Sequence, residues 1–244
     1  ERSIGSAGAA RYTAAMSSVR WDNVYAREGK RWGDAPGELA RIAVARLSSA
    51  ATRGLRILEV GCGYGRDAVY LAEQLVAHVV GIDPAASGLA IARRRAVPSR
   101  GTVEYRQATV EDVSDGPYAA LFVSNVYHGL RPAERSALHA AVPRLLSPGG
   151  LLFLSTLAVG DPTHYGCGAP VPNDPESFAG HTYLHFSSPT SLRAEFGGRF
   201  LFERVSLSAF HEPHDEGPGH DHVHVIMVAR LLRGEGGASL DQVL

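Results

Sequence analysis

The chain has 244 residues, of which 45% are hydrophobic and 20% charged, and this composition is ordinary for a globular domain. Its 24 basic and 25 acidic residues nearly cancel, so nucleic acid is not expected as its main partner. No apolar run approaches the roughly 18 residues of a membrane-spanning helix, so no membrane partner is expected. The two cysteines, Cys62 and Cys167, form no CxxC pattern, which favours a reducing, cytoplasmic setting.

Short apolar runs alternate with helical patterns from residue 55 onward. The expected elements are, in chain order, a strand at 55–60, a helix at 65–75, a strand at 77–83, a helix at 86–96, strands at 102–108 and 118–125, a helix at 132–146 and a strand at 149–156. Pro143 should bend or shorten the last helix. Two further strand patterns, 199–210 and 222–232, are separated only by a loop. We therefore predict an α/β fold, with a doubly wound, mostly parallel seven-stranded sheet that ends in an antiparallel hairpin.

The predicted sheet has additions at both of its ends. Residues 1–50 are expected to form an N-terminal helical cover, and residues 51–244 the α/β domain itself. Residues 157–187 are rich in proline and glycine and show no clear periodicity. Loops of that length are usually functional or disordered. We expect this segment and the loop 211–222 to select the substrate.

The most informative stretch is "LEVGCGYGRDAVYLA" at residues 58–72, in which three glycines alternate between a strand and a helix. Such a turn lets the backbone approach a nucleotide cofactor, and the helix N-terminus offers free N–H groups. An acidic residue, Asp83, ends the next strand, where a ribose-binding carboxylate belongs in this topology. The dinucleotide fingerprint would need glycine where this chain has Arg66, so a ligand with ribose and adenine but no phosphate is favoured.

A family resemblance supports this interpretation. The glycine stretch and the segments "VVGIDPA", "VEYRQATVEDV", "YAALFVSNVYHGL" and "AVPRLLSPGGLLFLST" resemble, in order, the motifs of class I S-adenosylmethionine-dependent methyltransferases. The resemblance covers about residues 20 to 232. Within the class, "GCGYGRDAVYLA" and the tail look most similar to small-molecule methyltransferases of the tellurite-resistance and thiopurine type. The resemblance implies S-adenosylmethionine as cofactor and methyl transfer to a polar small molecule by in-line attack on the sulfonium methyl.

The resemblance also implies roles for single residues. Glu59 and the glycines Gly61, Gly63 and Gly65 would line the methionine part of the cofactor, and Asp83 would accept both ribose hydroxyls. Around the adenine and the reacting group it implies Pro84, Thr109, Val110, Glu111, Ser124 and Asn125. Thr109 departs from the family pattern, because an acidic residue often meets the adenine amine there.

Three more cofactor contacts are expected from the helical cover and the turn. Tyr25 and Trp32 would close over the cofactor, although Trp32 could equally anchor the first helices in the core. Arg66 could meet the methionine carboxylate or simply begin its helix.

Nine of the eleven histidines are expected at the carboxyl edge of the sheet, where ligands bind in such folds. They could form a solvated loop without a role. They could also supply a base, with His128 the best candidate because it follows the fourth strand, and with His185 and His211 as further candidates. Finally, they could bind a divalent metal through imidazoles at short spacing, namely His211, His214, His220, His222 and His224.

Two rival functions remain open at this point. One is a metal- or metalloid-binding, detoxifying protein on the same fold. The other is an enzyme that binds S-adenosylmethionine for non-methyl chemistry. The sequence does not indicate the oligomeric state.

Overall fold

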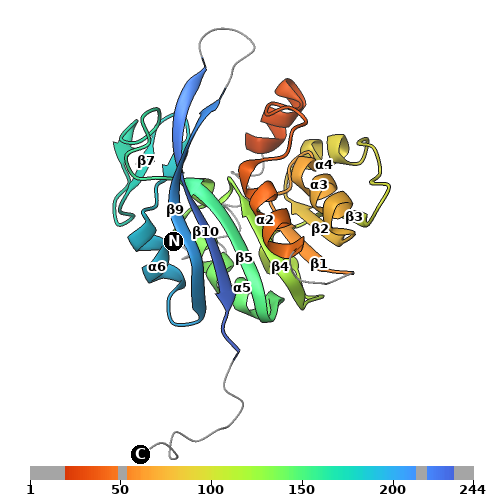
Figure 1. Ribbon diagram of the computed structural model, residues 1–244. Helices are drawn as coiled ribbons and strands as arrows, with labels where there is room; N and C mark the ends of the chain where they lie inside the picture. The colour runs from red at the N-terminus through yellow and green to blue at the C-terminus, as the bar shows by residue number, and fades with distance from the viewer. Residues whose placement is uncertain (1–19, 49–53, 213–218, 234–244) are drawn as a thin grey trace, which may run out of the picture.

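A seven-stranded sheet in the order β3-β2-β1-β4-β5-β10-β9 forms the centre of the molecule (Figure 1). The computed structural model describes residues 20–48, 54–212 and 219–233. Strands β1 to β5 run parallel, and β10 pairs antiparallel with both β5 and β9. The strands are β1 Arg56–Val60, β2 His78–Asp83, β3 Thr102–Gln107, β4 Tyr118–Ser124, β5 Leu146–Leu157, β9 Phe200–Glu212 and β10 His220–Leu231. The predicted fold class is therefore confirmed.

Helices cover both faces of the sheet, because successive residues of a strand point to opposite faces. In β1, Leu58 belongs to one hydrophobic core and Ile57 to the other. Leu138 of α5 packs in the first core, and Leu71 of α3 packs in the second. The α-helices are α2 Glu38–Ser48, α3 Arg66–Leu75, α4 Ala86–Ala92, α5 Pro132–Leu145 and α6 Pro189–Phe196, with 3₁₀ turns η1 Val110–Asp112 and η2 Tyr127–Gly129, and residues 20–28 are also helical. None of the helices in these described ranges is long and apolar enough to cross a membrane.

Pro143 lies two residues before the end of α5. The helix continues through Pro143 to Leu145, and β5 begins at the next residue, Leu146. The strand therefore starts three residues before the predicted position. Proline lacks the N–H group that would bond to the carbonyl four residues earlier and its ring crowds that carbonyl, which agrees with a helix that ends two residues after Pro143.

The segment 157–187 carries a small sheet that the sequence pattern does not predict. Its strands are β6 Ala169–Pro170, β7 Ser177–Ala179 and β8 Tyr183–His185, in that order. Strands of two or three residues are too short to show an alternating pattern. Tyr165, Phe178 and Phe186 pack against one another, with ring centroids 5.3 to 6.0 Å apart. These rings therefore hold the segment together.

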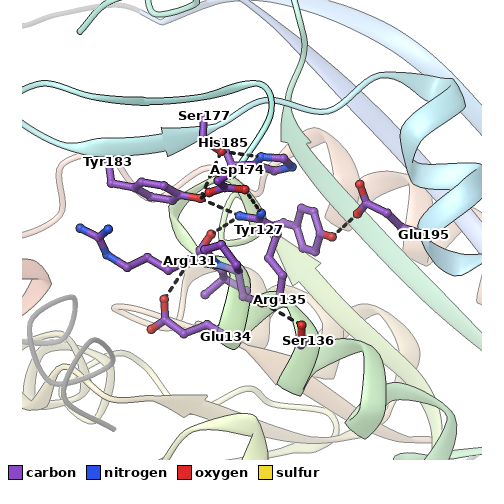
Figure 2. Close-up of polar contacts among 12 residues, drawn as sticks. Tyr127, Arg131, Glu134, Arg135, Ser136, Asp174, Ser177, Tyr183, His185 and Glu195 are labelled. Atoms are coloured by element: carbon purple, nitrogen blue, oxygen red, sulfur yellow. Dashed lines mark hydrogen bonds and ion pairs between the residues drawn. The ribbon is translucent and has the colours of Figure 1, made fainter. Parts of the chain in front are cut away.

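A buried ion pair fixes this segment to α5 (Figure 2). The Arg135 guanidinium lies 2.5 Å from Asp174 Oδ1, and both side chains are nearly inaccessible to solvent. The Tyr183 hydroxyl donates to Asp174 Oδ2 at 2.6 Å and accepts from Arg135 at 2.7 Å. Burial raises the pKa of Asp174, but hydrogen bonds from Tyr183 and Arg135 outweigh it and leave the pKa below its usual value. The carboxylate is thus held in its charged form.

Candidate active site

A cavity of ≈ 860 Å³ opens at the carboxyl ends of the parallel strands. This is the edge at which open α/β sheets bind their ligands. The expected cofactor residues that line it are Tyr25, Trp32, Glu59, Gly61, Gly63, Arg66, Asp83, Ser124 and Asn125. The structure therefore brings together side chains from the N-terminal helix, the glycine turn and the ends of β2 and β4.

The three glycines of the turn all have positive φ, at 72°, 52° and 74° for Gly61, Gly63 and Gly65. A β-carbon on any of them would overlap a neighbouring side chain: Val126, Tyr25 and Tyr105 respectively. Glycine is thus required by backbone conformation and by close packing of protein side chains as well as by any ligand. Gly61 and Gly63 also line the cavity, whereas Gly65 does not.

Gly63→Ala should lower the free energy of unfolding by about 2–4 kcal/mol, because it adds left-handed strain to an overlap with the Tyr25 hydroxyl. Gly198→Ala is the matched control, since φ is 79° there and nothing lies within 4 Å of the added carbon. Adding Tyr25→Phe should recover the share of the stability loss that the overlap causes, because the nearest remaining ring atom, Cζ, lies 3.1 Å from the added β-carbon. Chemical denaturation checks this. Equal losses for Gly63→Ala and Gly198→Ala would contradict the packing argument.

Asp83 fixes the turn to the end of β2. One carboxylate oxygen accepts the N–H of Gly63 and the other accepts the N–H of Ala85, both at 2.8 Å. Asp83 is buried yet lines the cavity. Burial raises its pKa, while the two N–H donors oppose that shift. Each carboxylate oxygen can accept a further hydrogen bond, so ligand hydroxyls can still be received.

Glu59 carries an unsatisfied carboxylate oxygen at the wall of the cavity. Its Oε2 is buried and has no hydrogen-bond partner. Burial, followed by the nearby Asp67 carboxylate, raises the pKa of Glu59 well above its usual value. A buried polar atom without a partner is costly and needs an explanation. A cationic or N–H donor on a bound ligand would satisfy it.

The N-terminal segment closes one side of the cavity with aromatic rings. Trp32 stacks on Tyr64 with ring centroids 6.4 Å apart and planes 11° apart. Arg66 donates to the Trp32 carbonyl at 3.1 Å and is also the first residue of α3. Tyr25 is buried and packs edge-on against Tyr64. Trp32 and Arg66 therefore hold the cover in place and also line the cavity, and their contact with a cofactor stays a prediction.

The end of β4 is held by a serine that the sequence analysis did not single out. Asn125 has φ 57° and donates its N–H to the Ser155 carbonyl at 3.1 Å. The Ser155 hydroxyl donates to the Asn125 side-chain oxygen at 3.1 Å and lines the cavity with Ser124. Ser155 lies in β5 and is the register partner of Ser124 in β4. The sequence analysis missed it because the register between two strands cannot be read from a single sequence.

Four other expected cofactor residues do not line the cavity. Thr109 accompanies η1, and its N–H and hydroxyl both donate to Asp112 at 2.8 Å. Val110 is part of a hydrophobic core, and Glu111 is exposed. The Pro84 carbonyl accepts from Gln107 at 3.2 Å. In the structure these residues therefore contact neighbouring protein groups and do not line the cavity.

The structure separates the candidate catalytic histidines. His185 is buried away from the cavity, where its Nδ1 lies 2.9 Å from the Ser177 hydroxyl (Figure 2). His211 is largely exposed and its Nδ1 lies 2.8 Å from Asp221. His211 and Asp221 are register partners on β9 and β10, so they share the face opposite to the cavity. We therefore set aside His185 and His211 as candidates for contact with a substrate.

His128 does line the cavity, in the turn after β4. Its Nδ1 is buried without a hydrogen-bond partner. Burial, then the nearby imidazole of His224, lowers the pKa of His128 to about 3. The side chain is therefore neutral at neutral pH, and it offers a lone pair rather than a charge.

The remaining histidines show a different grouping from the expected metal ligands. His220, His222 and His224 line the cavity, as alternation along β10 predicts, but His211 does not and His214 lies outside the described residues. Among the described residues, the three that approach one another as possible ligands are His164, His220 and His222. The sequence analysis did not include His164, which comes from the 157–187 segment.

Residues 57–150 match the family model of the methyltransferase domain. The sheet order, the glycine turn and the acidic residue that ends β2 agree with this match, so residues 57–150 form a methyltransferase domain with the fold of the class I S-adenosylmethionine-dependent enzymes.

A ubiquinone biosynthesis O-methyltransferase of Hahella chejuensis is 35% identical over 138 residues, which are 52% of this chain and 56% of the relative. The chain thus spans about half the length of the curated relatives it matches. The 1,6-didemethyltoxoflavin-N1-methyltransferase structure of Burkholderia thailandensis, with S-adenosylhomocysteine bound, has a TM-score of 0.62 at 20% identity, covering 91% of this chain and 90% of that one. TehB from Haemophilus influenzae has a TM-score of 0.60 at 14% identity, covering 86% of this chain and 67% of that one. At these identities the two structures show likeness of fold alone.

Proposed function

We propose that the chain binds S-adenosylmethionine in the cavity and transfers its methyl group to a polar small molecule. The observation that carries this proposal is the unpartnered Oε2 of Glu59, which lies on the same cavity as the Asp83 carboxylate and the Arg66 guanidinium. The cofactor offers a matching set of groups: an ammonium, a ribose diol and a carboxylate. Glu59 would receive the ammonium, Asp83 the diol and Arg66 the carboxylate.

When bound, S-adenosylmethionine supplies an electrophilic methyl group on a sulfonium. The protein must then hold the acceptor in line and exclude water. Tyr25, Trp32, Ser124 and Asn125 all line the cavity. In this proposal Tyr25 and Trp32 cover the cofactor, and Ser124 and Asn125 lie near the reacting group. A strong acid is not required by this reaction, so the polar wall of histidines can serve binding and orientation.

The relatives with O-methyltransferase names support oxygen as the acceptor atom. His128 fits such an acceptor, because a neutral imidazole can accept a hydrogen bond from a hydroxyl. With a pKa of about 3 it is a weak base, so the acceptor itself would have to be acidic, as a phenol is. We propose a polar, hydroxylated small molecule as the substrate class.

The first experiment is calorimetric titration with S-adenosylhomocysteine, followed by assays with tritiated methyl donor on a panel of phenols and polar metabolites. We expect one binding site per chain and label transfer to a hydroxylated compound. Binding without transfer of label, together with another product of the donor, would favour non-methyl chemistry. Absence of binding to folded protein would contradict the proposal.

A further inference from the structure

Three histidines from distant parts of the chain meet on one wall of the cavity. His164 comes from the 157–187 segment, and His220 and His222 come from β10. One nitrogen from each ring can be chosen so that all three lie within 4.8 Å of one another. Nitrogens bound to one tetrahedral zinc ion at about 2.1 Å are about 3.4 Å apart, so modest rotation of the rings would bring all three to one ion.

A buried carboxylate orients this cluster. The Asp161 side chain is wholly inaccessible to solvent, and its Oδ2 lies 3.1 Å from Nδ1 of His222. Asp161 also accepts the backbone N–H groups of Val223 at 2.9 Å and His164 at 2.8 Å. One carboxylate therefore ties both ligand-bearing segments together. Since an ionised carboxylate only accepts, Nδ1 of His222 carries the proton and Nε2 keeps its lone pair, which is the arrangement found around histidines that bind metals.

A second carboxylate lies on the other side of His222. Glu212 Oε2 is 3.6 Å from Nε2 of His222, and Glu212 is the register partner of His220 across β9 and β10. Glu212 also lines the cavity. Three imidazoles with an adjacent carboxylate are a donor set suited to zinc, iron, cobalt or nickel rather than to calcium or magnesium.

A solvated loop of histidines does not account for these contacts. The His222 side chain is 4% exposed. The centroid of its ring lies 4.6 Å from that of His220 and 5.1 Å from that of His164. Packing three imidazoles so closely, with their polar atoms facing one another, brings no apolar burial that hydrophobic residues would not give better. A shared ligand explains the arrangement.

We propose that His164, His220 and His222 bind one divalent transition-metal ion, with Asp161 orienting His222 and an open coordination position facing the cavity. Resting on the proposed function, the open position would receive an oxygen of the methyl acceptor. That substrate would then be a hydroxylated small molecule able to coordinate a metal. Three protein ligands and one open position are the pattern of catalytic rather than structural zinc sites.

The test uses untagged full-length protein, stripped with a chelator and titrated with Zn²⁺ by calorimetry, and with Co²⁺ by visible absorption. We expect one ion per chain. His220→Ala and His164→Ala should abolish this binding, and Asp161→Asn should weaken it about 10- to 100-fold. Replacing the buried His222 could unfold the protein, so the half-buried His220 and His164 are the better ligands to replace. Circular dichroism would verify that the His220→Ala and His164→Ala variants are folded.

Two control variants separate the possible outcomes. His78→Ala, at the opposite edge of the sheet, should bind Zn²⁺ as the unchanged protein does. His211→Ala should also retain binding, because His211 faces away from the cluster. Loss of binding in His211→Ala but not in His164→Ala would overturn the ligand assignment. Absence of a stoichiometric ion, while S-adenosylhomocysteine still binds, would overturn the metal site and leave the proposed function standing. Failure of both titrations on folded protein would remove both.

Discussion

Asp83→Ala should weaken the binding of S-adenosylmethionine about 100-fold or more. A ribose diol held by a carboxylate makes two charge-assisted hydrogen bonds, each worth roughly 1.5–3 kcal/mol, and about 1.4 kcal/mol corresponds to a tenfold change in affinity. The substitution also removes the acceptor of the Gly63 and Ala85 N–H groups, so the glycine turn loses one of its hydrogen bonds to β2 and keeps those from Gly61 and Cys62 to the Ile82 carbonyl. Calorimetry with S-adenosylmethionine measures the loss.

Two further variants test the cause of that effect. Asp83→Asn keeps one acceptor oxygen and should fall between Asp83→Ala and the unchanged protein. Glu104→Ala removes an acidic group from the neighbouring strand β3, where it forms an exposed pair with Arg106, and it should leave the affinity unchanged. Unchanged affinity in Asp83→Ala would show that the cofactor is bound elsewhere. An equal loss in Glu104→Ala would point to a general charge effect.

Asp174→Ala should lower the free energy of unfolding by about 3–5 kcal/mol, because it leaves the Arg135 guanidinium buried without its counter-ion. The same change removes an acceptor from Tyr183 and weakens the attachment of the 157–187 segment to α5, which then depends on the hydrogen bond from Arg135 to Tyr183. That segment carries His164, so we expect Zn²⁺ binding to weaken as well. Chemical denaturation measures the stability loss.

The matched control is Asp34→Ala, which removes the exposed Asp34 carboxylate from its ion pairs with Lys30 and Arg95 and should change stability much less. The double replacement Arg135→Met with Asp174→Leu should recover much of the loss, because neither charge is then left unpaired. A loss of stability in Asp174→Ala no larger than in Asp34→Ala would contradict the structural role of this ion pair.

Most of the expected cofactor residues that line the cavity are close together in the chain. The glycine turn, Glu59 and Arg66 lie within eight residues, and the local pattern of strand, turn and helix places them at one end of the sheet. Asp83 follows from the rule that parallel strands end at the same edge. The stretch from Thr109 to Glu111 failed to reach the cavity because its backbone turns into η1, where Asp112 takes the polar groups of Thr109.

The sequence alone determined the chain order of the seven strands in the main sheet, the antiparallel hairpin at its end and the glycine turn after β1, because periodicity and backbone conformation are properties of neighbouring residues. Tertiary structure alone decided which histidines meet. The pairing of β9 with β10 turns His211 toward Asp221, and the folding of the 157–187 segment brings His164 beside His222. Tertiary packing likewise decided which side chains exclude a β-carbon at each glycine, since Tyr25, Tyr105 and Val126 come from separate elements. Contacts between residues far apart in the chain depend on register and on the path of long loops, and neither leaves a periodic signal in one sequence.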